Sequence, residues 1–403
     1  MNQSTYDCIV IGGGISGISF AHYLKKAGKK DLIVAKNNRI GGQIQTEHSS
    51  VNPDYWFEMG SHTCYNSYTS LLSIVDETGN NELIQPLQKH SFVLYSSGKI
   101  KSLFSGVSKL PMILCFFKYF FADKTGKTTR EYFRPLVGAK NYDKLFRNAF
   151  KAVICQPADD YPAEIFLKKR KERYKEHPRR VTFKNGLSSI LKTVVEKENI
   201  EVQLSSEIIN IRKAEDTFSL ETKDGKIFQA RNIALASSPR ISSSLLKDTE
   251  AELSELLFTI PLFQSESLNI VIPKEKLALK EIAGIISLSD DFLSAVSRDL
   301  ISDEQLRSFT FHFEKGKRNK EETIKLICEV LGVSPTDIVE QTYTEHTLPA
   351  MRLQHLQMEE KVNEKRKNDS IYLLGNYFYG LSLEDCVNRS KMEAERFLST
   401  DQN

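Results

Sequence analysis

The stretch that decides the fold is YDCIVIGGGISG, residues 6–17. Its first half, residues 6–11, is a short apolar run that ends abruptly at glycine, which predicts a buried β-strand. A helical pattern follows from Ile18 to about Lys26, and residues 31–34 (DLIV) form a second strand-like run. This order of strand, glycine-rich turn, helix and strand predicts a β-α-β unit of about thirty residues.

The three spaced glycines of this unit are typical of a diphosphate-binding turn. Gly12 permits the tight turn, Gly14 lets a pyrophosphate approach the backbone, and Gly17 lets the helix pack closely against the strand. The N-terminus of this helix, with its unpaired N–H groups and partial positive charge, would face the phosphates. A glycine-rich turn without a ligand is the alternative, but the flanking strands and helix at this spacing favour the binding motif.

Composition limits the class of protein. The 403 residues predict two or three domains, and 40% hydrophobic with 27% charged residues is typical of a globular protein. The 55 basic and 52 acidic residues lack the clustered excess that would predict nucleic-acid binding. Six scattered cysteines form no C-x-x-C pair, so we expect no metal site and free thiols in a reducing compartment. With no signal-peptide pattern at the start of the sequence, we expect a cytoplasmic protein.

Four separated segments together resemble one known family. They are the glycine-rich turn, RIGG (39–42), FEMGSHT (57–63) and YLLGNYFYG (372–380), the last of which is followed by LEDCV (383–387). In this combination the chain resembles the flavin-containing amine oxidoreductases. The G-N-Y-F-x-G and D-C pattern of the last segment is most similar to the protoporphyrinogen oxidase branch.

This resemblance implies an α/β, multi-domain fold. Its core would be a Rossmann-like FAD-binding domain of the p-hydroxybenzoate-hydroxylase and amine-oxidase type, accompanied by a discontinuous substrate domain and a helical insert. The chain would divide into a FAD-binding domain (1–88, 181–240 and 365–403), a helical insert facing substrate or membrane (89–180) and a substrate-binding domain (241–364).

The resemblance also implies non-covalently bound FAD and a set of cofactor-binding residues. Gly12, Gly14, Ile15, Ser16 and Gly17 would hold the pyrophosphate, while Arg39, Gly41, Gly42 and Gln43 would lead from it to the isoalloxazine. Ala35 would lie at the ribose and Ile208 at the adenine, with Lys36 and Ala236 in the same set. Gly60, Ser61 and His62 would pass near the flavin ring, and Gly375, Asn376 and Leu383 would meet the ribityl chain and the pyrimidine edge. The helix that begins near Leu383 would stabilise negative charge on reduced flavin through its dipole.

Two positions depart from the family pattern. Ala35 stands where the family places a glutamate that binds the adenosine ribose, and Gln43 stands where an arginine usually follows the double glycine. The loss of two hydrogen bonds from a carboxylate would cost about 1.5–3 kcal/mol of binding free energy. We therefore expect FAD to bind through its other contacts, but more weakly.

Flavin chemistry asks little of the protein, because the cofactor accepts the hydride and the chain orients the substrate. His62 is the best candidate for a catalytic residue, since the motif places it near the flavin and it can take up a proton, although a structural histidine fits equally well. Tyr377 and Tyr379 would form an aromatic wall at the substrate or pack in the core. Arg134, in the insert, would pair with a substrate carboxylate or lie on the surface.

Residues 110–121 are the most apolar segment of the chain. About a dozen residues are too few to span a bilayer. We expect a buried core helix or an apolar substrate tunnel, with peripheral membrane contact as the less favoured alternative. The basic run KKRKER (168–173) and Arg179-Arg180 would suit anionic headgroups, but a solvated helix face is the simpler interpretation.

These observations predict an FAD-dependent oxidoreductase. It would take a hydride from a small apolar or aromatic substrate (an amine, a porphyrinogen-like compound or a biosynthetic intermediate), with dioxygen as the oxidant that restores the flavin. A flavin-dependent isomerase or desaturase on the same scaffold is one alternative, and a degenerate flavin-fold binding protein is another. The sequence leaves the substrate and the oligomeric state open.

Overall fold

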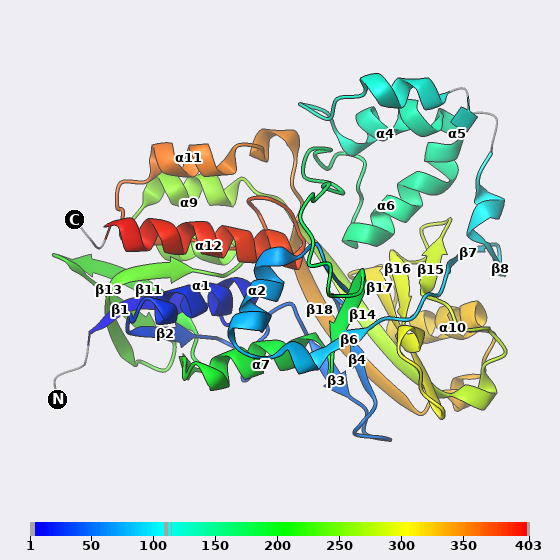
Figure 1. The fold of residues 1–403 in the computed structure, drawn as a ribbon, viewed down its shortest axis with the longest axis horizontal. Helices are drawn as coiled ribbons and strands as arrows, with labels where there is room; N and C mark the ends of the chain where they lie inside the picture. The colour runs from blue at the N-terminus through cyan, green and yellow to red at the C-terminus, as the bar shows by residue number, and fades with distance from the viewer. Residues whose placement is uncertain (1–4, 109–111, 114, 401–403) are drawn as a thin grey trace.

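Two large β-sheets form the body of the molecule, and a helical lobe lies above the second of them (Figure 1). The structure is a computed structural model, and it describes residues 5–108, 112–113 and 115–400. The mixed α/β, multi-domain fold class predicted from the sequence is confirmed. The domain boundaries given above stay a prediction.

The first sheet contains the predicted β-α-β unit. Its strands follow the order β10 (Glu201–Gln203), β2 (Asp31–Val34), β1 (Tyr6–Ile11), β13 (Ile227–Leu235), β12 (Thr217–Thr222) and β11 (Ile208–Ala214), and β19 (Ile371–Leu373) pairs with β13. The strands β10, β2, β1, β13 and β19 run parallel to one another. The strand β12 pairs antiparallel with β13, and β11 pairs antiparallel with β12. The strands at residues 6–11 and 31–34 are confirmed as predicted.

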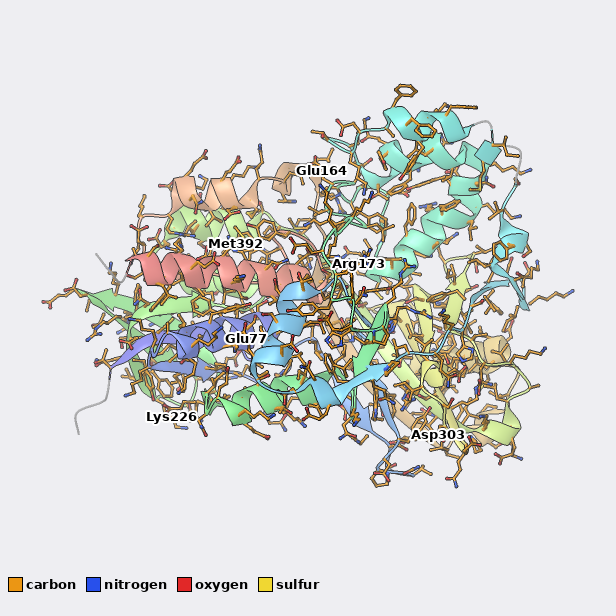
Figure 2. The ribbon with its side chains drawn as sticks, in the orientation of Figure 1. Glu77, Glu164, Arg173, Lys226, Asp303 and Met392 are labelled. Atoms are coloured by element: carbon orange, nitrogen blue, oxygen red, sulfur yellow. The ribbon has the colours of Figure 1, made fainter. Side chains whose placement is uncertain are left out.

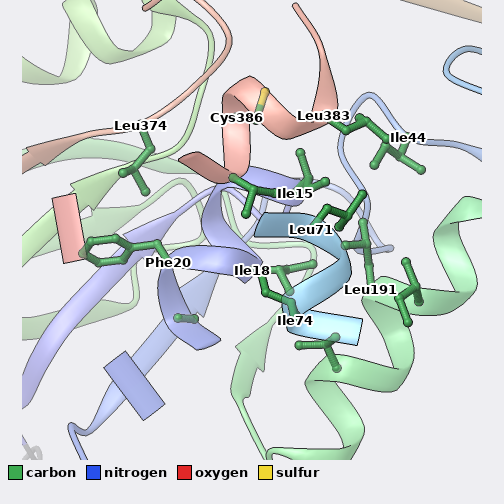
Figure 3. Packing of buried hydrophobic residues seen from close by; sticks show 14 of the residues in the cluster. Ile15, Ile18, Phe20, Ile44, Leu71, Ile74, Leu191, Leu374, Leu383 and Cys386 are labelled. Atoms are coloured by element: carbon green, nitrogen blue, oxygen red, sulfur yellow. The ribbon is translucent and has the colours of Figure 1, made fainter. Parts of the chain in front are cut away.

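Helices cover both faces of this sheet, which explains why the parallel strands β1, β2 and β19 are apolar along most of their length. Along β1, Cys8 and Val10 belong to the core cluster on one face and Ile9 and Ile11 to the cluster on the other. The first face is covered by α1 (Ile15–Lys26), α2 (Thr69–Glu77), α7 (Leu187–Lys197) and α12 (Leu383–Thr400), whose packing is drawn in Figure 3. The second is covered by α8 (Pro239–Leu246), α9 (Ala251–Phe258) and α11 (Met358–Lys365).

The second sheet is built mostly of antiparallel strands. Its order is β18 (Glu340–Pro349), β14 (Leu262–Pro273), β17 (Leu306–Glu314), β16 (Ser294–Ser297), β15 (Gly284–Ser287), β7 (Phe92–Ser96) and β8 (Lys99–Ser102), and α10 (Lys320–Leu331) packs against it. The stretch after Lys89 was predicted to be largely helical, and at its start this is wrong. Residues 92–102 form β7 and β8 because β7 finds a parallel partner in β15, far along the chain.

The helical lobe contains α4 (Thr129–Val137), α5 (Ala139–Asn141) and α6 (Arg147–Ile154). Leu110, Pro111 and Leu114 of the apolar segment 110–121 lie outside the described residues. The predicted buried core helix is wrong for the rest, because residues 116–121 form a short 3-10 helix on which Phe121 is 90% exposed and Tyr119 is 66% exposed. Within the described ranges, no helix combines the length and apolarity needed to cross a bilayer.

Two small sheets join the large ones. They consist of β3 (Thr46–His48) with β4 (Trp56–Glu58), and of β5 (Cys64–Tyr65), β9 (Arg180–Phe183) and β6 (Ile84–Pro86). Glu58, at the end of β4, ties the first pair to α7: its carboxylate accepts hydrogen bonds from Leu187 N (2.6 Å) and Thr46 Oγ1 (3.0 Å). Burial raises the pKa of Glu58 to about 8, against the opposing effect of these donors.

The variant Glu58→Gln tests whether the Glu58 carboxyl is neutral in the folded protein. A group whose pKa rises on folding contributes stability below its unfolded pKa and loses it as the pH climbs to the folded value. We therefore expect Glu58→Gln to gain stability relative to the wild type between pH 4.5 and 8, by about 1.4 kcal/mol per pH unit. Urea denaturation across this range measures the difference. A constant difference would mean that Glu58 stays ionised beside the N-terminus of α7.

Candidate functional site: a cofactor cleft and its cavity

The parallel strands of the first sheet all end at the same edge. The register pairs Ile11 with Val34 and with Leu235, and Leu235 with Leu373, so the residues that follow these strands are neighbours. Those residues are Gly12, Ala35, Ala236 and Leu374, and Gly375 comes directly after Leu374. Carboxyl-terminal edges of this kind are where open α/β sheets bind their ligands. Sites predicted from four distant parts of the sequence are thereby brought together.

The glycine-rich turn leaves the N-terminus of α1 open. Gly14 precedes the first residue of the helix, no side chain caps this end, and the first turn carries no acidic residue. The leading N–H groups of a helix have no partner within the helix, so those at Ile15 and Ser16 are available to an anion. This arrangement matches the one expected for binding a diphosphate.

The absence of a side chain at Gly14 and at Gly17 has different explanations. A Cβ at Gly17 would lie 2.0 Å from Gly12 O, so the packing of helix on strand excludes a side chain there. A Cβ at Gly14 would lie no closer than 3.7 Å to its nearest neighbour, Gly42 Cα. Protein packing alone therefore does not require glycine at 14. The open backbone there fits the close approach of a cofactor phosphate, so these residues fit the pyrophosphate of FAD.

The double-glycine loop runs alongside this turn. Gly41 N donates to Gly13 O (2.7 Å), and Gly14 and Gly41 form an isolated parallel bridge. Arg39 holds the loop in shape, because its guanidinium donates to Ile44 O (3.0 Å) and Gly42 O (3.1 Å). The structure thus places Arg39 as a support of the loop, with Gly41 and Gly42 beside the glycine-rich turn.

The adenosine end is formed by residues after β2 and before β11. Ser206 N donates to Ala35 O (2.9 Å), which brings the loop leading to Ile208 beside the end of β2. Ala35 and Ile208 are buried, and Lys36 turns outward to pair with Glu207 (2.8 Å). The family pattern has a carboxylate at position 35, and the neighbouring residue here, Lys36, supplies no carboxylate in its place.

A cavity of about 590 Å³ has Gln43, the residue after the double glycine, in its wall. Gln43, Gly60, Ser61, His62 and Leu383, all predicted at the flavin ring, contribute to its wall. Gly375 and Asn376 are outside that wall, in the turn that links β19 to α12. Because residues predicted at the ring line a large cavity, the cavity has room for the isoalloxazine and for a substrate beside it.

The helix α12 begins at this cavity with Leu383. Ser382 Oγ accepts a hydrogen bond from Asp385 N (3.1 Å), so the hydroxyl caps the first turn. Glu384 turns away, and its carboxylate accepts from Ser70 N (2.9 Å) and Leu71 N (3.1 Å) at the start of α2. The N–H groups of the first residues of α12 are left for a ligand, as expected for a helix that stabilises a negatively charged ring edge.

Three histidines line the cavity: His62, His312 and His346. Burial lowers the pKa of His62 to about 4, with Arg180 adding to the effect, and burial together with the two neighbouring histidines lowers the pKa of His312 to about 3. Burial also lowers the pKa of His346. The imidazoles are therefore neutral near pH 7, and each can both donate and accept a hydrogen bond.

His346 links Gln43 to the loop after β4. Its Nε2 lies 3.0 Å from Met59 O, which can only accept, so Nε2 carries the proton. Its Nδ1 lies 2.9 Å from the side-chain amide of Gln43. A neutral imidazole then has a lone pair at Nδ1, and we expect the amide of Gln43 to turn its NH₂ group toward it. The glutamine that departs from the family pattern is thus fixed at the cavity wall.

The remaining walls are apolar on one side and basic on the other. The end of α6 (residues 152–155) and residues 165–167 of the insert supply most of the apolar surface. Lys168, Arg170, Arg173 and Arg179 supply the basic side. The sequence interpretation of this basic run as a solvated helix face is wrong, because residues 168–180 form no helix before β9 and four of their cations line the cavity.

Three predicted substrate residues lie elsewhere. Tyr377 is fully buried in the core, where its ring packs under Gly375 so closely that a Cβ there would lie 2.7 Å from it. Tyr379 donates to Glu359 and is absent from the cavity wall. Arg134 is exposed on α4 and pairs with Asp143 (3.1 Å). The structure corrects all three assignments, since packing and ion pairing already engage these side chains.

His312 and His346 were not predicted at the site from the sequence. His312 lies on the polar side of the alternating strand β17 (LRSFTFHFE), where other polar residues surround it in the sequence, and its Nδ1 lies 2.7 Å from Ser267 Oγ. The sequence of the strand alone therefore gives no signal that marks His312. The position of His346 depended on the pairing of β18 with β14, which only the three-dimensional fold defines.

Comparison with known proteins identifies the relatives of this chain. Residues 15–271 match the profile of the flavin containing amine oxidoreductases. A probable flavin-containing monoamine oxidase A of Dictyostelium discoideum is 33% identical over 97 residues, 24% of this chain and 19% of that protein. A 15-cis-phytoene desaturase of Narcissus pseudonarcissus is 28% identical over 93 residues, 23% of this chain and 16% of that protein. The matches thus span less than a fifth of these relatives.

Solved structures share the fold over almost the whole chain. A protein from Exiguobacterium assigned as a protoporphyrinogen oxidase superimposes with a TM-score of 0.77 at 16% identity, covering 99% of this chain and 100% of that one. Cyclohexylamine oxidase from Brevibacterium oxydans gives 0.74 at 14% identity, covering 99% and 100%. A fatty acid isomerase from P. acnes that produces CLA gives 0.71 at 16%, covering 97% and 98%. At these identities the likeness defines the fold.

A matched pair of glycine variants separates cofactor binding from folding. We expect Gly14→Ala to change the free energy of unfolding by less than about 1 kcal/mol and to weaken FAD binding at least tenfold, because the added methyl group occupies the phosphate approach. We expect Gly17→Ala to lose about 3 kcal/mol of stability or more, since its Cβ collides with backbone.

Thermal unfolding of the FAD-free variants and titration with FAD, followed by flavin fluorescence, measure both quantities. Wild-type FAD affinity in Gly14→Ala would contradict this placement of the pyrophosphate. A Gly17→Ala variant as stable as the wild type would contradict the close packing of α1 on β1.

Proposed function

This chain belongs to the family of flavin-containing amine oxidoreductases, and from that premise we propose that it oxidises an organic substrate with an apolar or aromatic body. The observation that carries the proposal is the cavity, where residues predicted at the flavin ring share one wall with the apolar end of α6. A substrate held there would lie against the ring. Dioxygen is proposed as the oxidant that completes the cycle.

The chain itself would bind, orient and shield the reactants. Gly12, Gly14 and the open N-terminus of α1 would hold the diphosphate, while Gly60, Ser61 and the start of α12 would flank the ring. When bound, FAD supplies a ring nitrogen, N5, that accepts a hydride from the substrate. The apolar residues of the insert would exclude water from that contact.

His62 is proposed to take up the proton that leaves the substrate as the hydride departs. Its Nδ1 lies 2.8 Å from Thr63 Oγ1. If Nδ1 carries the proton and donates it to that hydroxyl, Nε2 is left with a free lone pair. The low pKa of His62 makes it a weak base, but it leaves this nitrogen unprotonated near pH 7, so its lone pair is free to receive a proton. The substrate loses a hydride and a proton, and dioxygen leaves as hydrogen peroxide.

The likeness to a desaturase and to a fatty acid isomerase supports one rival of this proposal, a flavin enzyme that consumes no oxygen. Peripheral membrane contact through the exposed aromatic side chains of residues 117–121 stays a prediction.

The first test is anaerobic bleaching of the flavin. We expect FAD-loaded protein to lose its visible flavin absorbance when mixed with a substrate from a panel of amines, a porphyrinogen, unsaturated fatty acids and aromatic acids. Admission of air should restore the absorbance with one hydrogen peroxide formed per flavin. Turnover of a panel member without oxygen consumption would favour the isomerase. A protein that binds no flavin would contradict the oxidoreductase proposal.

The second test concerns the proton. We expect His62→Asn to lower the rate of anaerobic flavin reduction about a hundredfold, the usual contribution of a general base, without changing the flavin content. His48→Asn is the matched control, because His48 is exposed and bonds only to Pro53 O at 2.8 Å in the described structure. Stopped-flow absorbance with the best substrate of the panel measures the rates. An unchanged rate in His62→Asn would make His62 a structural residue.

A further inference from the structure

The charges around the cavity are unbalanced. Four cationic side chains line it, Lys168, Arg170, Arg173 and Arg179, against a single carboxylate, Asp385. A cavity with three surplus positive charges attracts anions and raises the free energy of a bound cation. This imbalance is unexpected for a pocket that oxidises amines, which are cations near neutral pH.

Asp385 is fully engaged by part of this set. Its carboxylate lies 3.0 Å from Arg170 Nη2 and 3.5 Å from Lys168 Nζ, and it accepts a hydrogen bond of 2.6 Å from Ser382 Oγ. Arg170 also donates to Ser382 Oγ (2.8 Å). Lys168 and Arg170 are therefore held in place at the start of α12. They neutralise Asp385, which is the one carboxylate that the described residues contribute to the cavity wall.

Arg173 and Arg179 have no such partner. Neither forms an ion pair within the described part of the chain, and Arg173 donates only to the neutral amide oxygen of Asn66 (3.3 Å). Both are exposed at the mouth of the cavity, and Arg173 lies close to the junction of the helical lobe with the two sheets (Figure 2). Their charges are available to a ligand.

The loop that carries the two arginines is anchored. Asn66 N donates to Arg179 O (3.2 Å), and Tyr174 N donates to Asn66 O (2.8 Å). Asn66 Nδ2 donates to His177 O (3.2 Å). Asn66 itself is buried, so these bonds fix residues 173–179 around one rigid point. The two guanidinium groups are thereby presented from a single, supported loop.

We propose that this cavity selects an amphipathic carboxylate, with its apolar body against the insert and its carboxylate at Arg173 and Arg179. Guanidinium groups bind carboxylates through paired, charge-assisted hydrogen bonds, and the apolar residues 152–154 and 165–167 lie on the same cavity wall. The proposal names the substrate class of the site and rests on the proposed oxidoreductase function. It excludes a simple alkyl amine as the preferred substrate.

A matched ligand series tests the selectivity. We use phenylbutanoate, phenylbutylamine and phenylbutanol, each with the ring on the terminal carbon, and measure binding to FAD-loaded protein by isothermal titration calorimetry. We expect the carboxylate to bind at least tenfold more tightly than the alcohol and the amine most weakly. The preference should weaken as salt is raised, because the arginines are exposed. Equal affinities, or a preference for the amine, would overturn the proposal.

Two double variants assign the effect to the loop. We expect Arg173→Gln with Arg179→Gln to weaken phenylbutanoate binding about tenfold to a hundredfold and to leave phenylbutanol unchanged. Arg212→Gln with Arg231→Gln removes the same charge from exposed positions of the first sheet, and we expect wild-type binding. Arg173→Glu with Arg179→Glu should shift the preference toward the amine. Loss of carboxylate binding in both neutral doubles alike would overturn the assignment.

The proposal and the oxidoreductase function fail in different ways. If FAD binds and a neutral or cationic substrate bleaches it, while carboxylates bind no better than alcohols, the oxidoreductase function stands and the carboxylate proposal is overturned. If carboxylates bind through the two arginines but nothing in the panel reduces the flavin or consumes oxygen, the carboxylate proposal stands and the oxidase function is overturned.

Discussion

The contact between Gly17 and Gly12 is the constraint on which the rest of the structure depends. Because no side chain separates them, α1 lies directly on β1, and its N-terminus is held at the carboxyl end of that strand. The register of the parallel strands then brings the residues after β2, β13 and β19 to the same edge. One close approach of backbone to backbone thus helps to bring together, from four distant segments, the residues that the sequence predicts at the phosphate, adenosine and ring portions of a cofactor.

Local patterns in the sequence were sufficient for this half of the molecule. The strands at 6–11 and 31–34 appear at the predicted residues, because each is a short apolar run that the sequence itself shows. Predictions failed where a partner distant in sequence decides the outcome. Residues 92–96 form a strand between β8, their hairpin partner, and β15, far along the chain. Tyr377 is a core residue because it packs in a cluster assembled from distant segments. A short window of sequence contains neither the pairing with β15 nor the members of that cluster.

The cavity divides its polar groups by their exposure to water. His312 and His346 are buried in its wall and His62 is partly buried, and desolvation lowers the pKa of all three, which keeps them uncharged and able to form hydrogen bonds. The permanently charged arginines lie at the mouth, where water still solvates them until a ligand displaces it. A substrate anchored by its charge at the mouth would therefore present its uncharged portion to the interior. Hydride transfer requires this orientation, because the carbon that loses the hydride has to lie inside the cavity beside the flavin ring.

The departures from the family pattern take on a different meaning in this setting. At position 35 a small buried residue stands where the family pattern has a carboxylate, and the next residue, Lys36, is paired with Glu207, so we expect weaker cofactor binding. At position 43 the replacement has its own partner, since the amide of Gln43 meets the neutral imidazole of His346. An arginine there would bring a charge beside a histidine that burial keeps neutral, and beside a mouth already rich in cations. Gln43 is therefore better explained as part of the charge balance of this particular cavity than as decay of the flavin site.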